Sequence, residues 1–233
     1  MALQLNEQVV PYKEFYGRIT EQMPLLVEDG RVPMSSADLM DRRLEVRGHK
    51  FSPEVRSAWH DNYFYTSDGI LYHPDRKIKV VPDFQSLREL HSKSKLIGGA
   101  LVLEPGVYEA TQAEEFTKEN LKNIIKNSLS RDVAKSNHFW KILARDQNRL
   151  NAYVDFVFDE TKRRFSYDQN MGLYIGTTQK EPTARSWVVD WLEFRSDAFG
   201  RGHLGSDDGR LVGVAPEAPN ARKAVEKPLE QRV

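Results

Sequence analysis

The sequence predicts an α+β fold in which a small antiparallel sheet packs against several amphipathic helices. Two observations carry this prediction. Apolar and polar residues alternate with turn signals near residues 62–81, which is typical of a strand meander. Apolar residues recur at helical spacing through residues 150–161, which indicates a long amphipathic helix. The order of helices, then strands, then helices favours a sheet covered by helices on one face.

Helices are expected in the first quarter of the chain. Ser36 is a suitable N-cap for a helix over residues 37–47, and Ser52 followed by proline starts another over residues 53–59. A shorter helix is expected over residues 12–22, because its aromatic and aliphatic residues have the spacing of one helical face: Tyr12, Phe15, Tyr16 and Ile19.

The next segment predicts a three-stranded meander. Residues 63–66 and 70–73 form two strands around an Asp68-Gly69 turn, and residues 77–81 form the third. Further along, the same criteria predict strands near 100–103 and 171–175 and helices over 84–91, 138–145, 150–161 and 182–192.

One compact body is expected over residues 1–204, with sub-lobes 1–111 and 112–204 as the alternative division. Residues 205–233 are rich in glycine, proline and charge and poor in large apolar residues. Such a composition buries too little surface to offset its conformational entropy, so we expect a flexible C-terminal tail.

Composition excludes several classes of chemistry and of partner. The chain has no cysteine, which removes disulfides, thiolate metal sites and cysteine nucleophiles. Lys+Arg and Asp+Glu both number 34, so binding to a polyanion must rely on a local surface. The first residues lack the basic and apolar regions of a signal peptide, and the longest apolar run, 96–103, is too short to span a membrane. We therefore expect a soluble, cytoplasmic protein.

The first candidate site is a surface of tyrosine and lysine on the predicted meander. Around an Asp68-Gly69 turn, one face of the strands would be apolar and the other would carry phenol rings and ammonium groups. Such rings can stack on bases while lysines contact phosphates. The residues predicted to bind nucleic acid in this way are Tyr63, Tyr65, Tyr72, Lys77 and Lys79. Half-exposed strands also favour these residue types without any ligand.

A second basic surface is expected on the helix that follows. Lys118, Lys122 and Lys126 recur every fourth residue, which places three ammonium groups on one helical face. They extend the predicted contact with nucleic acid or another polyanion, while pairing of Lys118 with Glu114 on a solvated face is the ordinary alternative.

Two weaker patterns allow for an enzyme, although neither indicates a particular reaction or cofactor. His60-Asp61 and His73-x-Asp75 flank the predicted hairpin, and their side chains could ligate a divalent metal if the hairpin brings them together. The polar connection at 163–172 could carry a catalytic site, with these residues as candidates: Arg164, Tyr167, Asp168 and Asn170.

The preferred hypothesis is a non-enzymatic binding protein. An enzyme of unknown reaction and a protein-interaction scaffold are the alternatives. The pattern Gly200-x-Gly202-x-x-Gly205 does not indicate a nucleotide site, because no strand is predicted before it and no helix after it.

Overall fold

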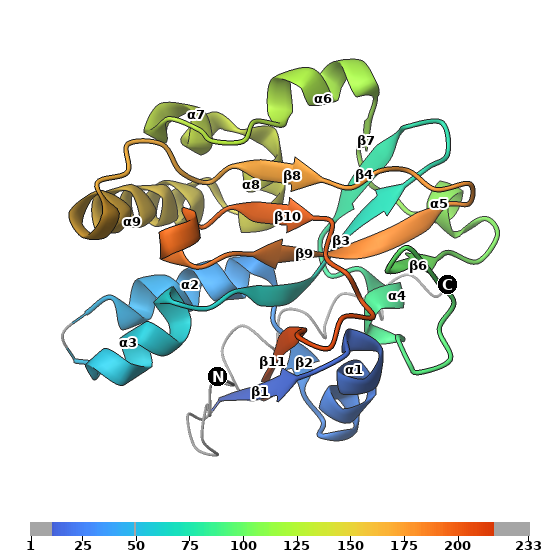
Figure 1. Cartoon of the computed structure of the whole chain (residues 1–233), viewed down its shortest axis with the longest axis horizontal. Coiled ribbons are helices and arrows are strands. Elements are labelled where there is room, and N and C mark those ends of the chain that lie inside the picture. Colours follow the sequence, from blue (N-terminus) through green and yellow to red (C-terminus); the bar gives the residue numbers. More distant parts are fainter. Residues whose placement is uncertain (1–10, 49, 217–233) are drawn as a thin grey trace, which may run out of the picture.

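A computed structural model describes residues 11–48 and 50–216 and shows a mixed α/β architecture with one large sheet (Figure 1). The strands of the described residues are β1 (Tyr12–Tyr16), β2 (Val32–Pro33), β3 (Phe64–Tyr72), β4 (Ile78–Val81), β5 (Leu96–Ile97), β6 (Ala100–Val102), β7 (Glu115–Phe116), β8 (Leu173–Ile175), β9 (Thr183–Val189), β10 (Ala198–Gly200) and β11 (Arg210–Val214). The helices are α1 (Ile19–Glu28), α2 (Ser36–Val46), α3 (Pro53–His60), α4 (Gln85–Arg88), α5 (Val107–Ala110), α6 (Lys118–Ile124), α7 (Arg131–Ser136), α8 (His138–Ala144), α9 (Gln147–Phe165) and the 3₁₀ turn η1 (Leu192–Phe194).

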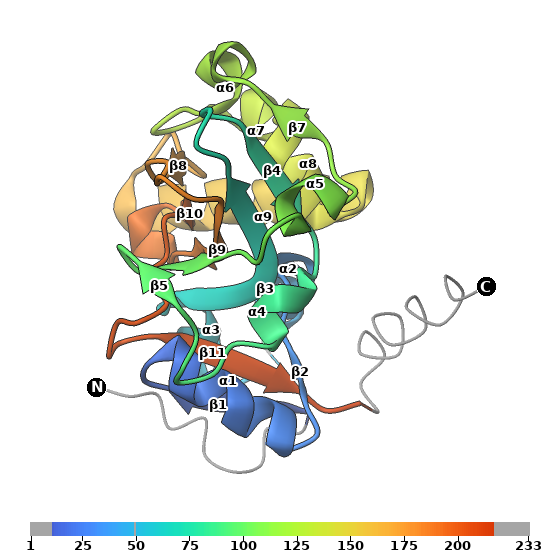
Figure 2. The same cartoon turned by 90° about the vertical axis from the view of Figure 1, so that its right-hand side faces the viewer.

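The sheet is larger than the small sheet that the sequence predicts. Its main path runs β1-β11-β3-β9-β10-β8. Off this path, β2 pairs with β11, β4 with β3 and β6 with β9, while β5 pairs with β6 and β7 with β4. The central strand β3 pairs antiparallel with β4 and β9 and parallel with β11. Figure 2 shows β11 beside β1, so strands from the two ends of the described chain are neighbours.

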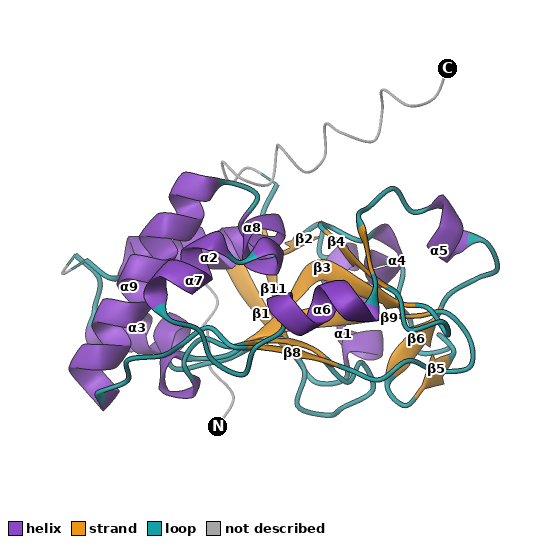
Figure 3. Ribbon diagram, turned by 90° about the horizontal axis from the view of Figure 1, so that it is seen from above, coloured by secondary structure: helices purple, strands orange, loops and turns teal. Residues whose placement is uncertain are grey.

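A hydrophobic core lies on each face of the sheet. Successive side chains of β3 alternate between the two: Ile70 and Tyr72 belong to one core and Leu71 to the other. The first core packs against α2, α8 and α9, which Figure 3 shows gathered with α3 and α7 at one end of the molecule, and it contains the buried Trp140 and Trp187. The second core packs against α1 and α4.

Many predicted elements are confirmed. The helices α2, α3, α8 and α9 and the strands β4, β6 and β8 occupy the predicted segments within a few residues. The N-cap of α2 is Ser35 instead of Ser36, and its hydroxyl accepts the backbone N–H of Asp38. Helix α9 extends over 19 residues, beyond both ends of its predicted segment.

The predicted hairpin at 63–73 is wrong, because β3 runs unbroken through Asp68 and Gly69. Asp68 is fully buried, and its carboxylate accepts the backbone N–H groups of Ser36 and Asp83 at 2.8 and 3.0 Å. A Cβ atom on Gly69 would lie 2.7 Å from the Cβ of Phe84, so the glycine permits close packing instead of a turn.

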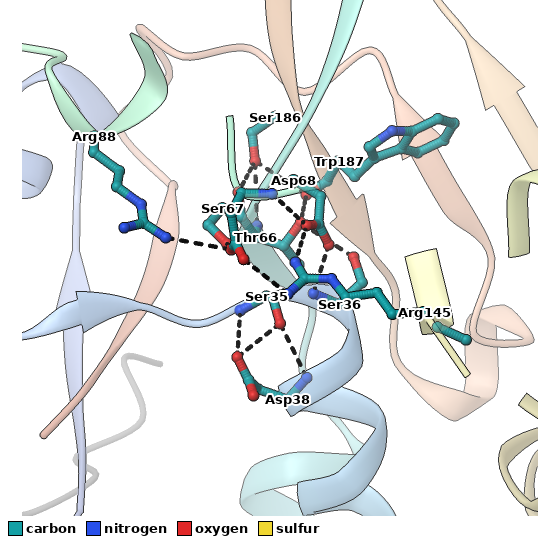
Figure 4. A network of polar contacts seen from close by, with 12 residues as sticks. Ser35, Ser36, Asp38, Thr66, Ser67, Asp68, Arg88, Arg145, Ser186 and Trp187 are labelled. Carbon is teal, nitrogen blue, oxygen red and sulfur yellow. Dashed lines mark hydrogen bonds and ion pairs between the residues drawn. The ribbon is translucent and has the colours of Figure 1, made fainter. Parts of the chain in front are cut away.

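Asp68 belongs to a polar network that joins five segments of the chain (Figure 4). Arg145, between α8 and α9, donates to Asp68 at 2.6 Å and to Asp83, before α4, at 2.7 Å. Thr66 in β3 accepts from Ser36 at the start of α2 and donates to the Trp187 carbonyl in β9. The network holds α2, β3, β9 and the β4–α4 connection in register.

Three further expectations are corrected. Residues 12–16 form β1 instead of helix, because their backbone pairs along its whole length with β11. Residues 183–189 form β9 instead of helix, because all seven are buried between β3, β6 and β10. Residues 210–214 form the buried β11, so the expected flexible tail does not begin at 205, while residues 217–233 lie outside the described part.

Candidate functional site

The predicted tyrosine and lysine surface does not form on β3 and β4. Tyr65 and Tyr72 are 6% and 1% exposed, and the Tyr72 hydroxyl donates to the Gly200 carbonyl at 2.5 Å. Lys79 is 8% exposed and donates to the carbonyls of Tyr108 and Thr111. Tyr65 and Tyr72 are buried because β3 lies in the middle of the sheet, with a core on each face, and Lys79 of β4 packs over the Tyr108 ring.

Two residues of that predicted surface keep solvent contact. Lys77 forms an ion pair with Glu115 at 2.9 Å. Tyr63, just before β3, is half-buried and donates its hydroxyl to the Asp208 carbonyl. Burial and the Asp208 charge raise the pKa of Tyr63 to about 12, so its ring stays neutral.

The predicted lysine face on one helix is interrupted. Lys118 and Lys122 are exposed on α6, but the helix ends at Ile124, before the exposed Lys126. Glu114 lies 2.7 Å from His138 and makes no ion pair with Lys118. Contact of these lysines with a polyanion stays a prediction.

The predicted histidine pairs are far apart. His60 and Asp61 precede β3, and His73 and Asp75 follow it, so a nine-residue strand separates them by roughly 30 Å at about 3.3 Å per residue. The His60 ring is 5% exposed, and its Nε2 lies 3.1 Å from the Arg43 carbonyl. Within residues 11–48 and 50–216, no three side chains of metal-ligating type gather into a cluster.

The four residues of the predicted catalytic loop contact different partners and do not form one site. Arg164 pairs with Asp61 at 2.7 Å, and Asp168 pairs with Lys162 at 2.8 Å in solvent. Asn170 is fully buried, and its side-chain nitrogen and oxygen have no hydrogen-bond partner among the described residues. Tyr167 stacks on Phe165 at 5.5 Å.

A surface rich in aromatic and arginine side chains lies where β3 and β11 begin and β1 and β9 end. Trp191, at the start of η1, packs edge-on against Phe194 at 4.6 Å and with tilted rings against Tyr63 at 5.7 Å. Phe194 is 53% exposed. We call this the aromatic surface, and define it by Tyr16, Tyr63, Tyr167, Trp191, Phe194 and Arg195.

Arginine side chains connect these rings. The Arg210 guanidinium lies 5.4 Å from the ring centroids of both Tyr16 and Tyr63, while its Nε pairs with Glu14, whose side chain is 7% exposed. The exposed Arg195 lies 5.0 Å from the Tyr167 ring. The aromatic surface therefore links the β9–β10 loop with the 163–172 loop.

A second aromatic group lies near the β8 edge. Tyr174 and Phe199 face each other across β8 and β10, stacked at 4.7 Å with an angle of 7° between the rings. The exposed Arg201 lies 5.0 Å from the Phe199 ring and has no carboxylate within 4 Å among the described residues.

Buried side chains fix the backbone that presents these groups. Ser196 is fully buried, and its hydroxyl lies 2.6 Å from the Tyr153 hydroxyl of α9. Arg43 of α2, also fully buried, donates to both hydroxyls. The turn between β9 and β10 thus rests on α9 (Figure 1).

Two carboxyl groups at the ends of this turn have raised pKa values. Burial, and next the neighbouring Asp197 charge, raise the pKa of Asp190 to about 7. Burial raises the pKa of Asp197 to about 6, although its carboxylate accepts the Gly172 N–H at 2.6 Å. Both groups titrate near neutral pH at the base of the aromatic surface.

Sequence reasoning missed most of this surface. It selected Tyr63 and Tyr167, but not Trp191, Phe194 or Arg195. The helix expected over 182–192 hid Trp191, because it assigned the tryptophans to a buried helical face. The β-branched composition of 183–189, next to an aromatic loop, is the signal that could have located them.

Comparison with known proteins identifies the fold alone. No family model matches the chain, and no curated protein matches it. None of the described helices has the length and apolar character needed to span a membrane. A solved structure reported as "Accommodation of massive sequence variation in Nanoarchaeota by the C-type lectin fold" is similar with a TM-score of 0.64 and 15% sequence identity, covering 89% of this chain and all of that one. The chain therefore resembles that protein in having the C-type lectin fold.

Proposed function

We propose that this chain is a binding protein that contacts a protein ligand through the aromatic surface. The observation that carries the proposal is the clustering of Trp191, Phe194 and Tyr63 at the surface, with Arg195 adjacent. Tryptophan, tyrosine and arginine are the residue types that contribute most to protein–protein binding free energy.

The structure of the loops supports this proposal. Between residues 190 and 209, exposed side chains alternate with buried ones that hold the backbone in place. The exposed residues include Phe194, Arg195 and Arg201, and the buried ones include Leu192, Ser196 and Leu204. The exposed positions can change without loss of core packing. The similar Nanoarchaeota structure is described as accommodating massive sequence variation, which agrees with a fold whose surface loops tolerate change.

Binding can be tested against arrayed peptides, glycans and oligonucleotides with a variant carrying Trp191→Ala, Phe194→Ala and Arg195→Ala. We expect saturable binding to peptides that this triple variant loses. A matched control carries Leu25→Ala, Val27→Ala and Val133→Ala, which removes apolar side chains that are 47–49% exposed on α1 and α7. The control should bind as the unmodified chain does.

Other outcomes would count against the proposal. Peptide binding that survives in the triple variant would show that another surface is used. Binding only to oligonucleotides, weakening steeply as salt rises, would indicate a polyanion ligand instead.

A further inference from the structure

A cavity of about 750 Å³ lies between α3 and α9, apart from the aromatic surface. The C-terminal end of α2 contributes Arg47, and the C-terminal half of α9 forms one wall. The lining residues are Arg47, Pro53, Arg56, Ser57, His60, Asp61, Phe156, Asp159, Glu160, Arg163 and Arg164. Three sequence-predicted candidates, His60, Asp61 and Arg164, meet here.

The carboxylates of the lining already have cationic partners. Asp61 pairs with Arg164 at 2.7 Å and accepts the Ser57 hydroxyl at 2.8 Å. Glu160 pairs with Arg163 at 2.6 Å, and the hydrogen bond from Arg163 is the main reason that the pKa of Glu160 is lowered. The third carboxylate, Asp159, pairs with Arg131 outside the cavity.

Two guanidinium groups of the lining remain without a carboxylate partner in the described chain. Arg56 donates one N–H to the Phe51 carbonyl at 2.8 Å, which orients the group and leaves its other donors free. Arg47 is exposed at the end of α2 and makes no ion pair with a described residue. The cavity therefore holds two guanidinium groups that form no ion pair with a described carboxylate.

Part of the cavity lining is less polar. His60 and Phe156 pack ring against ring at 5.0 Å, and Phe156 is 7% exposed. Burial lowers the pKa of His60, so its imidazole adds no charge at neutral pH. An organic group can pack on this part of the lining while an anionic group faces the arginines.

We infer that this cavity binds a small phosphate monoester, with Arg47 and Arg56 as the groups that contact the phosphate. A phosphate monoester carries close to two negative charges at neutral pH, which matches the two guanidinium groups that have no ion-pair partner. The planar guanidinium forms paired hydrogen bonds with phosphate oxygens. A carboxylate carries only one charge and leaves the other arginine uncompensated.

Isothermal titration with phenyl phosphate, at constant ionic strength and pH 7.5, tests this site. We expect saturable binding, weakened about tenfold or more by Arg47→Gln and by Arg56→Gln. Arg76→Gln is the matched control, since Arg76 is an exposed arginine in the β3–β4 turn with no carboxylate partner among the described residues. Thermal unfolding of each variant verifies that it is folded.

Benzoate has the same ring with a single negative charge and serves as the second probe. We expect it to bind at least about tenfold more weakly than phenyl phosphate. Equal affinity for the two probes would overturn the assignment to a phosphate group. Absence of saturable binding, or equal weakening by Arg47→Gln, Arg56→Gln and Arg76→Gln, would overturn the site itself.

Discussion

Asp190 shows how a single residue couples stability to pH. Its folded-state pKa of about 7 exceeds the ordinary value near 3.8, mainly because of burial and next because of Asp197. The folded chain therefore retains a proton that the unfolded chain releases. The stabilisation from this group is complete below about pH 4 and is lost as the pH rises to about 7.

Asp190→Asn should remove this dependence. At each pH, the free energy of unfolding of the unmodified chain is subtracted from that of the variant. This difference should be more positive at pH 8 than at pH 5 by on the order of 1–2 kcal/mol. Urea denaturation at the two pH values measures the difference. Part of the pH slope should remain, since Asp197 and Glu14 also have raised pKa values. An unchanged slope would show that Asp190 ionises normally in the folded chain.

Arg145 is the second residue whose side chain has a large effect on stability. It has a left-handed backbone conformation with φ of 60°, and its guanidinium reaches the fully buried Asp68. Nothing in the local sequence indicates this, because the two residues are 77 positions apart.

Arg145→Met should lower the free energy of unfolding by about 2–4 kcal/mol, because it leaves the buried Asp68 charge without its cationic partner. Arg76→Met is the control at an exposed arginine whose φ is also positive, and it should change stability by less than about 0.5 kcal/mol. Chemical denaturation of both variants tests the expectation. Equal stability of the Arg145→Met and Arg76→Met variants would mean that the buried Asp68 carboxylate does not need a cationic partner.

The elements differ in how well the sequence predicts them. Helix α9 was predictable, because its apolar stripe is long and its partners lie on one face. Strand β3 was not predictable, since Asp68-Gly69 has the composition of a hairpin turn. The contacts of these two residues with Ser36, Arg145 and Phe84, together with the pairing of Gly69 with β4 and β9, keep the strand extended. These partners are distant in sequence, so local propensity gave the wrong prediction.

The β9–β10 and β10–β11 loops should tolerate change at their exposed positions. Simultaneous replacement of Glu193, Phe194, Arg195 and Arg201 by serine should alter the free energy of unfolding by less than about 1 kcal/mol. Leu204→Ala, at a fully buried position, should cost about 2–5 kcal/mol. Denaturation midpoints of the two proteins give the comparison. Unfolding of the serine variant would show that these side chains maintain the fold.

At the scale of the whole molecule, the sheet brings distant segments together. Strand β11 lies between β1 and β3, so residues 210–214 form an interior strand of the sheet instead of a tail. The glycine-rich segment before β11 packs closely against the chain near Gly17. A Cβ atom on Gly209 would lie 2.5 Å from the Gly17 carbonyl oxygen. Composition alone could not distinguish this close packing from flexibility.

The same topology places the buried supporting elements and the exposed loops in different parts of the molecule. Helices α2, α8 and α9 and the two cores support the sheet, while the loops at one of its ends carry the exposed rings and arginines. Tyr63 and Tyr167 were selected from the sequence for other reasons and meet Trp191, Phe194 and Arg195 only through this arrangement.

The most direct test compares dissociation constants for the peptide ligand selected from the array. The chain carrying Trp191→Ala, Phe194→Ala and Arg195→Ala should bind at least about tenfold more weakly than the unmodified chain, while its free energy of unfolding changes by less than about 1 kcal/mol. Unchanged affinity, or an equal loss in the Leu25→Ala, Val27→Ala, Val133→Ala control, would contradict the account.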